Sequence, residues 1–376
     1  MRKLNLYLIL IILSYGCSNS DLDDNDSNKF TQKDLTLIAK DNNQYYQIDV
    51  LNNSKNINTT NLTETLGIEG PYKVLNTSPS LITFFKAGGN RFQVFQKNII
   101  TSETYIRNQF CDLGNQEGLN FPTNSDKKLI SFTYEVNENS TSNADRINNF
   151  IRIYDKQTEN CVKLLIGSGE LYFERTTIVN GENIYGYYTN EHSKYAIFKI
   201  NLNTNKKEKE LVFDGNFRAT IRDNELHIFF YNGDYEIYNA DNLDLKRKSN
   251  LDLKFFSEYP GFFKTQFIGN EMLFKLLYAQ PSPVSYGPAT IDLTTGEILT
   301  GLDFNLVAFW RELGGLLNAS VGITTYSVDL KSNLVVVGFE NTNQNNKSGG
   351  VVYSNFDGEI LKIVELEFIP DKIIIR

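Results

Sequence analysis

Residues 176–204 read TTIVNGENIYGYYTNEHSKYAIFKINLNT, and this stretch indicates how most of the chain folds. It contains short runs rich in β-branched and aromatic residues, which lie at 176–179, 184–188 and 196–201. Asn180-Gly181 separates the first two runs, and a polar turn at 202–204 follows the third. Short runs of this composition, bounded by Asn and Gly, predict antiparallel strands joined by tight turns.

The same pattern returns along the chain as an alternating strand, a polar turn and a further short strand. Seven instances recur at intervals of roughly 40 to 60 residues. Their alternating strands lie at 45–50, 91–95, 150–155, 196–201, 235–239, 289–292 and 350–354. Two further strands usually precede each instance, as at 218–221 and 226–230 before 235–239. Each repeat is therefore predicted to contain four antiparallel strands.

Four-stranded antiparallel repeats of this period resemble the blades of a β-propeller. The resemblance covers residues 34–376 and concerns the architecture, since no WD, kelch or YWTD signature assigns a named propeller family. The first repeat begins at 35–39 with a run that matches the second strand of a blade, so its first strand is missing. One short strand at 372–375 follows the seventh repeat and belongs to no other blade. We predict an all-β fold with a single propeller of seven blades, closed when the C-terminal strand joins the N-terminal blade. A six- or eight-bladed ring and a two-domain β-sandwich protein are the alternatives.

The first residues have the parts of a secretory signal peptide. Arg2 and Lys3 precede an apolar run at 4–13 that is too short to span a bilayer. Gly16-Cys17 then resembles the lipobox of bacterial lipoproteins, although Ser14 stands where an aliphatic residue is usual. The resemblance implies a signal peptide at 1–16 and a lipid on Cys17 that anchors the mature protein to a membrane. An ordinary signal peptide with a chance cysteine is the alternative.

An acidic stretch follows the cysteine, and 17–33 is predicted to be a disordered tether because it holds few apolar residues. It does not match a calcium-binding loop, since Asp26 and Gln32 stand where Gly and Glu are needed. The stretch resembles the export signal of Bacteroidota surface lipoproteins. That resemblance implies a lipid-anchored protein of the outer membrane, exposed at the cell surface; the inner leaflet of that membrane is the alternative.

Composition argues against two kinds of function. The formal net charge is −8 and no stripe of Lys and Arg is present, which argues against nucleic acid as a partner. The chain has only two histidines, and His192 lacks a Cys or His neighbour for a metal, while His227 alternates with apolar residues as a structural side chain does. Nucleophile, metalloprotease and phosphate-loop motifs are absent, so we predict no catalytic residues, no metal and no cofactor.

Binding is predicted on the face of the ring that carries the long loops. In a propeller, the loops between second and third strands share one face with the connections between blades, and the long loops here belong to this set. They lie at 61–72, 108–124, 137–147, 254–264, 280–287, 305–321 and 341–349. Exposed aromatic residues and Arg are typical binding anchors. The candidates are Trp310, Arg311, Tyr286, Tyr259 and Phe256. The alternative for each ring is a structural role in plugging the channel or sealing a junction between blades.

The two remaining cysteines give conflicting indications. An oxidising compartment favours a disulfide between Cys111 and Cys161. The predicted strand map opposes it, because it puts these residues near opposite faces of neighbouring blades, farther apart than the roughly 7 Å that a disulfide spans. A bridge would mean that the predicted boundaries between 105 and 165 are wrong.

The function predicted from these features is that of an outer-membrane surface lipoprotein that acts as a non-catalytic binding or scaffold propeller. By analogy with lipoproteins of this kind, it is expected to be an accessory subunit of a transport or assembly complex. A cell-surface glycan-binding protein is the first alternative. A carbohydrate-active enzyme with a pair of catalytic carboxylates is the second.

Overall fold

The computed structural model describes a compact unit that spans Lys33–Arg376. The described residues are 30–52, 57–68, 70, 72, 74–78, 80–88, 91–113, 117–136, 147–170, 177–251, 261–278, 281–299, 304–342 and 348–376. The predicted signal peptide, Cys17 and the tether up to residue 29 lie outside them. Among the described residues, no helix combines the length and apolar character needed to cross a membrane.

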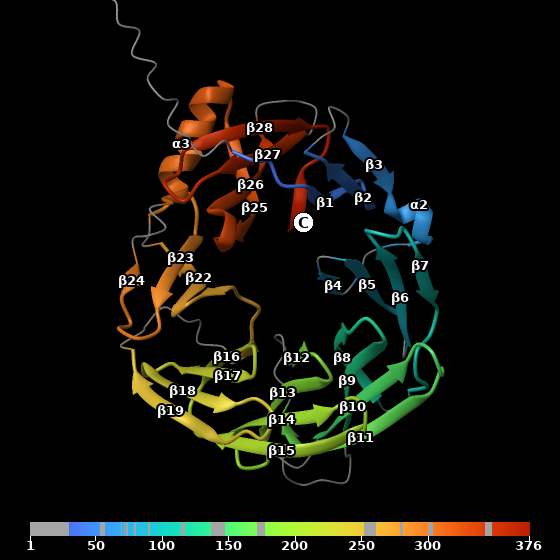
Figure 1. Ribbon diagram of the computed structural model, residues 1–376. Helices are drawn as coiled ribbons and strands as arrows, with labels where there is room; N and C mark the ends of the chain where they lie inside the picture. The colour runs from blue at the N-terminus through green and yellow to red at the C-terminus, as the bar shows by residue number, and fades with distance from the viewer. Residues whose placement is uncertain are drawn as a thin grey trace, which may run out of the picture. The chain divides into compact units, whose positions relative to one another are not determined.

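The unit is a β-propeller whose described strands form seven antiparallel groups (Figure 1). Blade one comprises β29 (Pro370–Ile375), β1 (Leu35–Asp41), β2 (Gln44–Val50) and β3 (Asn58–Asn61), and blade two comprises β4 (Val74–Thr77), β5 (Leu81–Gly88), β6 (Arg91–Asn98) and β7 (Thr104–Arg107). Blade three comprises β8 (Glu117–Asn124), β9 (Lys128–Val136), β10 (Ile147–Asp155) and β11 (Cys161–Glu170). Blade four comprises β12 (Thr177–Asn180), β13 (Asn183–Asn190), β14 (Tyr195–Asn201) and β15 (Lys206–Phe213).

The remaining three blades follow the same order. Blade five comprises β16 (Phe217–Arg222), β17 (Glu225–Phe230), β18 (Asp234–Asn239) and β19 (Leu245–Asn250). Blade six comprises β21 (Phe267–Ile268), β22 (Glu271–Leu277), β23 (Tyr286–Asp292) and β24 (Ile298–Leu299). Blade seven comprises β25 (Val321–Asp329), β26 (Leu334–Asn341), β27 (Ser348–Ser354) and β28 (Ile360–Leu366). A two-residue strand, β20 (Gly261–Phe262), pairs in parallel with β16. The predicted all-β propeller is confirmed.

The ring closes where the prediction put the closure. β29 pairs with β1 in antiparallel register, with Leu35 opposite Ile375 and Ile38 opposite Lys372. Blade one is therefore built from both ends of the chain, with β29 as its innermost strand and β1 paired on both sides, to β29 and to β2. Elsewhere, two residue pairs link β11 of blade three to β13 of blade four. Gly169 lies in this link with φ +143°, and a Cβ there would approach the carbonyl oxygen of Thr189 to 1.9 Å, so the site requires glycine.

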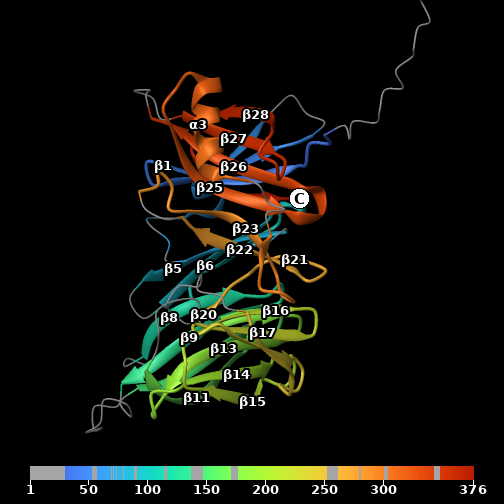
Figure 2. The same ribbon diagram turned by 90° about the vertical axis from the view of Figure 1, so that its left-hand side faces the viewer.

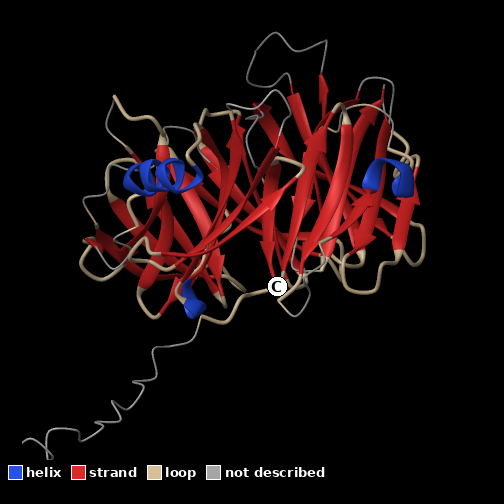
Figure 3. Cartoon of the chain, turned by 90° about the horizontal axis from the view of Figure 1, so that it is seen from above, coloured by secondary structure: helices blue, strands red, loops and turns tan. Residues whose placement is uncertain are grey.

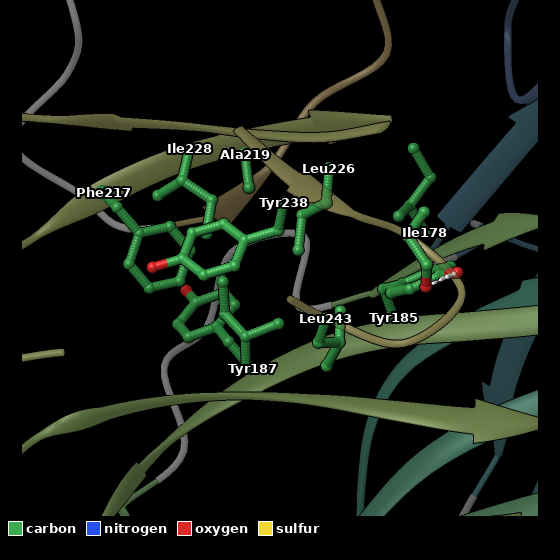
Figure 4. Packing of buried hydrophobic residues seen from close by; sticks show 11 residues of the cluster. Ile178, Tyr185, Tyr187, Phe217, Ala219, Leu226, Ile228, Tyr238 and Leu243 are labelled. Carbon is green, nitrogen blue, oxygen red and sulfur yellow. Dashed lines mark hydrogen bonds between the residues drawn. The ribbon is translucent and has the colours of Figure 1, made fainter. Parts of the chain in front are cut away.

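The core lies between neighbouring blades, because each strand alternates residues toward the blade before it and the blade after it. Figure 4 shows the junction of blades four and five, where Tyr187 and Phe217 meet edge to face with ring centroids 5.6 Å apart. Tyr185 comes from the same blade as Tyr187, and its hydroxyl donates to the carbonyl of Ala240, 2.7 Å away. This junction thus combines apolar burial with a hydrogen-bonded phenol group.

Two faces of the ring differ in their connections (Figure 3). The long-loop face carries the connections between blades, with α2 (Leu62–Leu66) before blade two and α3 (Leu306–Leu317) before blade seven. The short-turn face carries the turns between first and second strands and between third and fourth strands, including the 3₁₀ helix η1 (Leu330–Ser332) between β25 and β26.

The structure corrects some predicted loop boundaries. The predicted loop at 108–124 ends in β8, which begins at Glu117, and the one at 254–264 contains β20. The predicted loop at 305–321 contains the helix α3, which is capped at both ends. Asn305 accepts hydrogen bonds from the backbone of Val307 and Ala308, and Asn318 ends the helix in the left-handed conformation.

Candidate functional site

The predicted anchors Trp310 and Arg311 are neighbours on α3, but they have different surroundings. The Trp310 indole N–H donates to the carbonyl of Val321, 2.6 Å away, and its half-buried ring packs against the core of blade seven. Arg311 is exposed. Figure 2 shows α3 beside β25 and β26. Trp310 therefore fixes the helix to the blade, whereas Arg311 is available to a partner.

Tyr286 lies at the start of β23 and is 37 % exposed. The Lys275 ammonium lies 3.1 Å from the centre of its ring, and the Tyr326 ring lies 6.2 Å away. Burial, followed by the nearby Tyr286 and Tyr278, raises the pKa of Tyr326 well above its ordinary value. Leu277, the cross-strand partner of Tyr286, is 58 % exposed. The hairpin of blade six thus presents apolar and aromatic surface on the long-loop face.

The other two predicted anchors, Tyr259 and Phe256, lie outside the described residues. The structure therefore brings Tyr286 and Arg311 to one face of neighbouring blades. We give the name rim group to Tyr286, Leu277 and Arg311.

A first hollow, of about 540 Å³, opens on the short-turn face between blades two and three. We call it the two–three hollow, and it is lined by Ser80, Leu81, Gln96, Asn98, Glu103, Thr104, Tyr105, Asp126 and Lys156. Lys156 donates to Gln96 Oε1 over 3.1 Å and lies 5.4 Å from the centre of the Tyr105 ring. Burial lowers the pKa of Lys156, an effect partly opposed by Asp126. The hollow thus combines one aromatic ring with hydroxyl, amide and charged groups.

A second hollow, of about 230 Å³, opens on the same face between blades five and six. We call it the five–six hollow, and it is lined by Arg222, Glu225, His227, Tyr235, Ile237, Lys246, Arg247, Asn270, Leu293 and Thr294. His227 is only 2 % exposed, and its Nδ1 lies 2.6 Å from the Tyr235 hydroxyl. Burial, opposed by Glu225, lowers the pKa of His227 to about 4, so the imidazole is neutral at neutral pH.

The structure joins Cys111 to Cys161 by a disulfide with a Cα–Cα distance of 5.4 Å. The predicted strand map was wrong here, for a geometric reason. The outer strand β7 ends at Arg107, opposite Val94 in the middle of β6, so the chain leaves the blade before it reaches the long-loop face. Cys111 then packs with Phe110 against Tyr154, whose strand partner is Cys161.

In the described part of the chain, no group of three or more His, Cys, Asp or Glu side chains is placed so that it could hold a metal ion. Two carboxylates, Glu103 and Asp126, line the two–three hollow. Sequence reasoning missed both hollows, because their residues come from turns far apart in the chain. The only local signal was His227, a polar residue in an otherwise apolar strand.

The chain was also compared with known proteins. A scan of family models and a search of curated proteins found no match to this chain. Among solved structures, BamB from Moraxella catarrhalis is similar, with 12 % identity, a TM-score of 0.34, and coverage of 66 % of this chain and 67 % of that one.

Two peptidases are similar over more of the chain. The acylaminoacyl peptidase of Pyrococcus horikoshii has 11 % identity and a TM-score of 0.48, covering 88 % of this chain and 51 % of its own. A puromycin-hydrolysing peptidase of Mycobacterium tuberculosis has 10 % identity and a TM-score of 0.47, covering 90 % and 54 %. This chain spans about half the length of both peptidases. At these identities the likeness concerns the fold alone.

Proposed function

We propose that this protein is a lipid-anchored β-propeller of the outer-membrane surface that binds a partner and does not catalyse a reaction. The observation that carries the proposal is the position of Lys33, where the compact unit begins. The Lys33 carbonyl accepts a hydrogen bond of 3.1 Å from Tyr353, and its ammonium lies 3.9 Å from Asp329, the residue before η1. A lipid on Cys17 would therefore be connected to the ring through the short-turn face.

The opposite, long-loop face then carries the groups suited to a protein partner. The rim group combines a tyrosine ring and a guanidinium, which are residue types enriched at binding hot spots, with an exposed leucine that adds apolar surface. Leu316 of α3 is also 60 % exposed. We infer that the propeller is an accessory subunit of an outer-membrane transport or assembly complex, with the rim group as the surface that contacts the partner.

Metabolic labelling tests the anchor. Cells that express the full chain are grown with an alkyne analogue of palmitate, and membranes are separated from soluble fractions. We expect label on the wild type and its recovery with outer membranes, whereas Cys17→Ala should lose the label and part or all of the membrane association. A labelled Cys17→Ala protein, or an unlabelled wild type, would overturn the lipid anchor.

Site-specific crosslinking tests the partner. A photo-crosslinking amino acid replaces Arg311 or Tyr286, and in the control it replaces Lys206, which is exposed on the outer strand β15. We expect one discrete high-mass adduct from positions 311 and 286 and none from 206. If the protein migrates alone after mild detergent extraction and forms no adduct from the rim group, the accessory-subunit function is wrong.

The two–three hollow favours glycan binding as a second candidate function. Sugars bind through ring stacking combined with hydroxyl, amide and carboxylate hydrogen bonds, and Tyr105, Asn98 and Asp126 offer these groups in one hollow. Burial raises the pKa of Tyr105 to about 12, so its hydroxyl remains protonated and able to donate.

A glycan array tests this candidate. Any glycan binding seen with the wild type should be abolished in Tyr105→Ala. Tyr231→Ala, which removes an exposed ring between β17 and β18, should bind as the wild type does. Absence of binding by the wild type to every polysaccharide would exclude the candidate. Cleavage of a bound polysaccharide that is lost in Asp126→Asn or Glu103→Gln would instead identify a carbohydrate-active enzyme.

A further inference from the structure

The five–six hollow is a positively lined site on a protein of net negative charge. Arg222, Lys246 and Arg247 line it, and Glu225 is the one acidic residue among the described lining. The whole chain has a formal net charge of −8. Cations gathered in a hollow of an acidic protein create a local field that attracts anions.

The cations of the hollow keep unused hydrogen-bonding capacity. Lys246 pairs with Glu225 Oε1 at 3.0 Å. Arg222 donates to the Gly269 carbonyl over 2.6 Å and lies 3.6 Å from the exposed Asp223. Arg247 makes no hydrogen bond or ion pair with the described residues. Because a guanidinium carries five N–H donors, both arginines can still bind an oxyanion.

The unpaired ring nitrogen of His227 is an independent indication that the hollow is a ligand site. The side chain is buried, it lines the hollow, and its Nε2 has no hydrogen-bond partner among the described residues. The nearest charged atom, Glu225 Oε2, lies 3.6 Å away, beyond hydrogen-bond distance. We assign the ring proton to Nε2, because the Tyr235 hydroxyl lies 2.6 Å from Nδ1 and can donate to it. Nε2–H then lacks an acceptor, and a buried unpaired donor is unfavourable.

We propose that the five–six hollow binds a phosphate group, with Arg222 and Arg247 pairing with its oxygens and His227 Nε2–H donating to one of them. Phosphate offers several acceptor oxygens in different directions, which matches donors that come from β16, β17 and β19. Glu225 remains paired with Lys246. The hollow lies on the short-turn face, where Lys33 also lies, so the phosphate belongs to a lipid headgroup or to a small phosphate in solution.

Histidine NMR of the full chain in detergent tests the site with inorganic phosphate. The chain has two histidines, so selective isotope labelling gives one signal from His227 and one from the exposed His192. We expect phosphate to shift the His227 Nε2 signal in a saturable manner and to leave His192 unchanged. Parallel shifts of both signals, or no shift of His227, would overturn the proposal.

Charge variants add a second readout. Arg222→Ala/Arg247→Ala should weaken phosphate binding roughly tenfold or more, because it removes the two charge-assisted pairs. Arg247→Ala alone changes an exposed side chain and should weaken binding in the same direction without loss of fold. Lys206→Ala removes an exposed positive charge outside the hollow and is the matched control. Equal weakening by Lys206→Ala would mean that phosphate binds through net charge alone, and the proposed site would be wrong.

Nanodiscs of defined composition separate the two sources of phosphate. Discs with anionic phosphatidylglycerol or with zwitterionic phosphatidylcholine are added to each variant. A His227 shift with phosphatidylglycerol discs that is lost in Arg222→Ala/Arg247→Ala identifies a lipid headgroup, whereas a shift with inorganic phosphate alone identifies a soluble ligand. The site does not depend on lipidation of Cys17, since Cys17→Ala protein can be tested with the same phosphate titration.

Discussion

Leu35 and Ile375 face each other across a pair of antiparallel strands, so the first described strand of the ring is bonded to the last. Thr36 and Ile374 form the next pair, and Ile374 also packs in the core cluster between blades one and two. The junction at which the chain closes is thus both a strand ladder and a part of the core. Closure pairs the otherwise open inner edge of β1 with β29, so that β1 has a strand on each side.

Ile374→Asp should destabilise the ring by roughly 3 kcal/mol or more, because it buries an unpaired carboxylate in an apolar cluster. Lys372→Ala, an exposed position of the same strand, should change the free energy of unfolding by less than about 0.5 kcal/mol. Urea unfolding of both variants measures the difference. Similar stabilities for the two variants would show that closure by β29 contributes little.

Reduction of the Cys111–Cys161 disulfide should lower the free energy of unfolding by about 2–4 kcal/mol, because the bridge closes a loop with a sequence separation of 50. Urea unfolding with and without dithiothreitol measures the effect. Cys111→Ser/Cys161→Ser should show the lower stability in both conditions. Cys17→Ser should keep the wild-type response to reductant, since it leaves this pair intact; a response lost in Cys17→Ser would contradict the pairing.

Arg152→Ala should cost about 3–5 kcal/mol, because it leaves Glu117 buried without its main partner. The Arg152 Nε lies 3.0 Å from Glu117 Oε1, and the Glu117 side chain is fully buried within blade three. A second cation, Lys163, lies 3.0 Å from the same oxygen and is shared with Glu135, and the Thr133 hydroxyl also donates to that oxygen over 3.3 Å.

Thermal and urea unfolding test this ion pair against an exposed one. Lys194→Ala breaks the pair of Lys194 with Asp214, in which both side chains are largely exposed, and should cost less than about 1 kcal/mol. Arg152→Met/Glu117→Met should recover most of the stability lost in Arg152→Ala, since no buried charge is then left unpaired. If the double variant is as unstable as the single one, packing rather than charge accounts for the loss.

His227 should make stability depend on pH between about 4 and 6.5. Burial lowers its folded-state pKa to about 4 from 6.5 in the unfolded chain, so the unfolded state binds more protons in this range. Stability contributed by the neutral ring is complete above pH 6.5 and is lost as pH falls toward 4. The loss amounts to about 3 kcal/mol at most.

His227→Gln should flatten this part of the pH profile. Urea unfolding at several pH values between 4 and 7 gives the difference between variant and wild type, in which the contributions of other groups cancel. The charges that face His227 are Glu225, Asp223, Arg222 and Lys246, and all remain in the variant. Parallel pH profiles for the two proteins would mean that His227 titrates at its ordinary pKa.

The disulfide shows where sequence reasoning reached its limit. The strand order and the oxidising compartment could be inferred from local patterns, but the distance between Cys111 and Cys161 depends on where β7 leaves its blade. Because β7 ends early, the segment that follows it packs Phe110 and Cys111 against Tyr154 beside Cys161, and the period-two pattern does not encode where a strand ends. Trp310 is a similar case, since the sequence revealed an aromatic anchor but could not show that its N–H is already bonded to Val321.

The sequence alone determined the blades of this protein, because alternation along each strand and Asn or Gly at each turn are short-range features that fix local structure. It also located the closing strand, since the unmatched strands at both ends of the repeat can satisfy their backbone groups only by pairing with each other. Only the tertiary structure decided the hollows, which bring together residues as far apart as Ser80 and Lys156, or Arg222 and Thr294. Their geometry depends on how neighbouring blades pack, and that packing is set by many side chains at once.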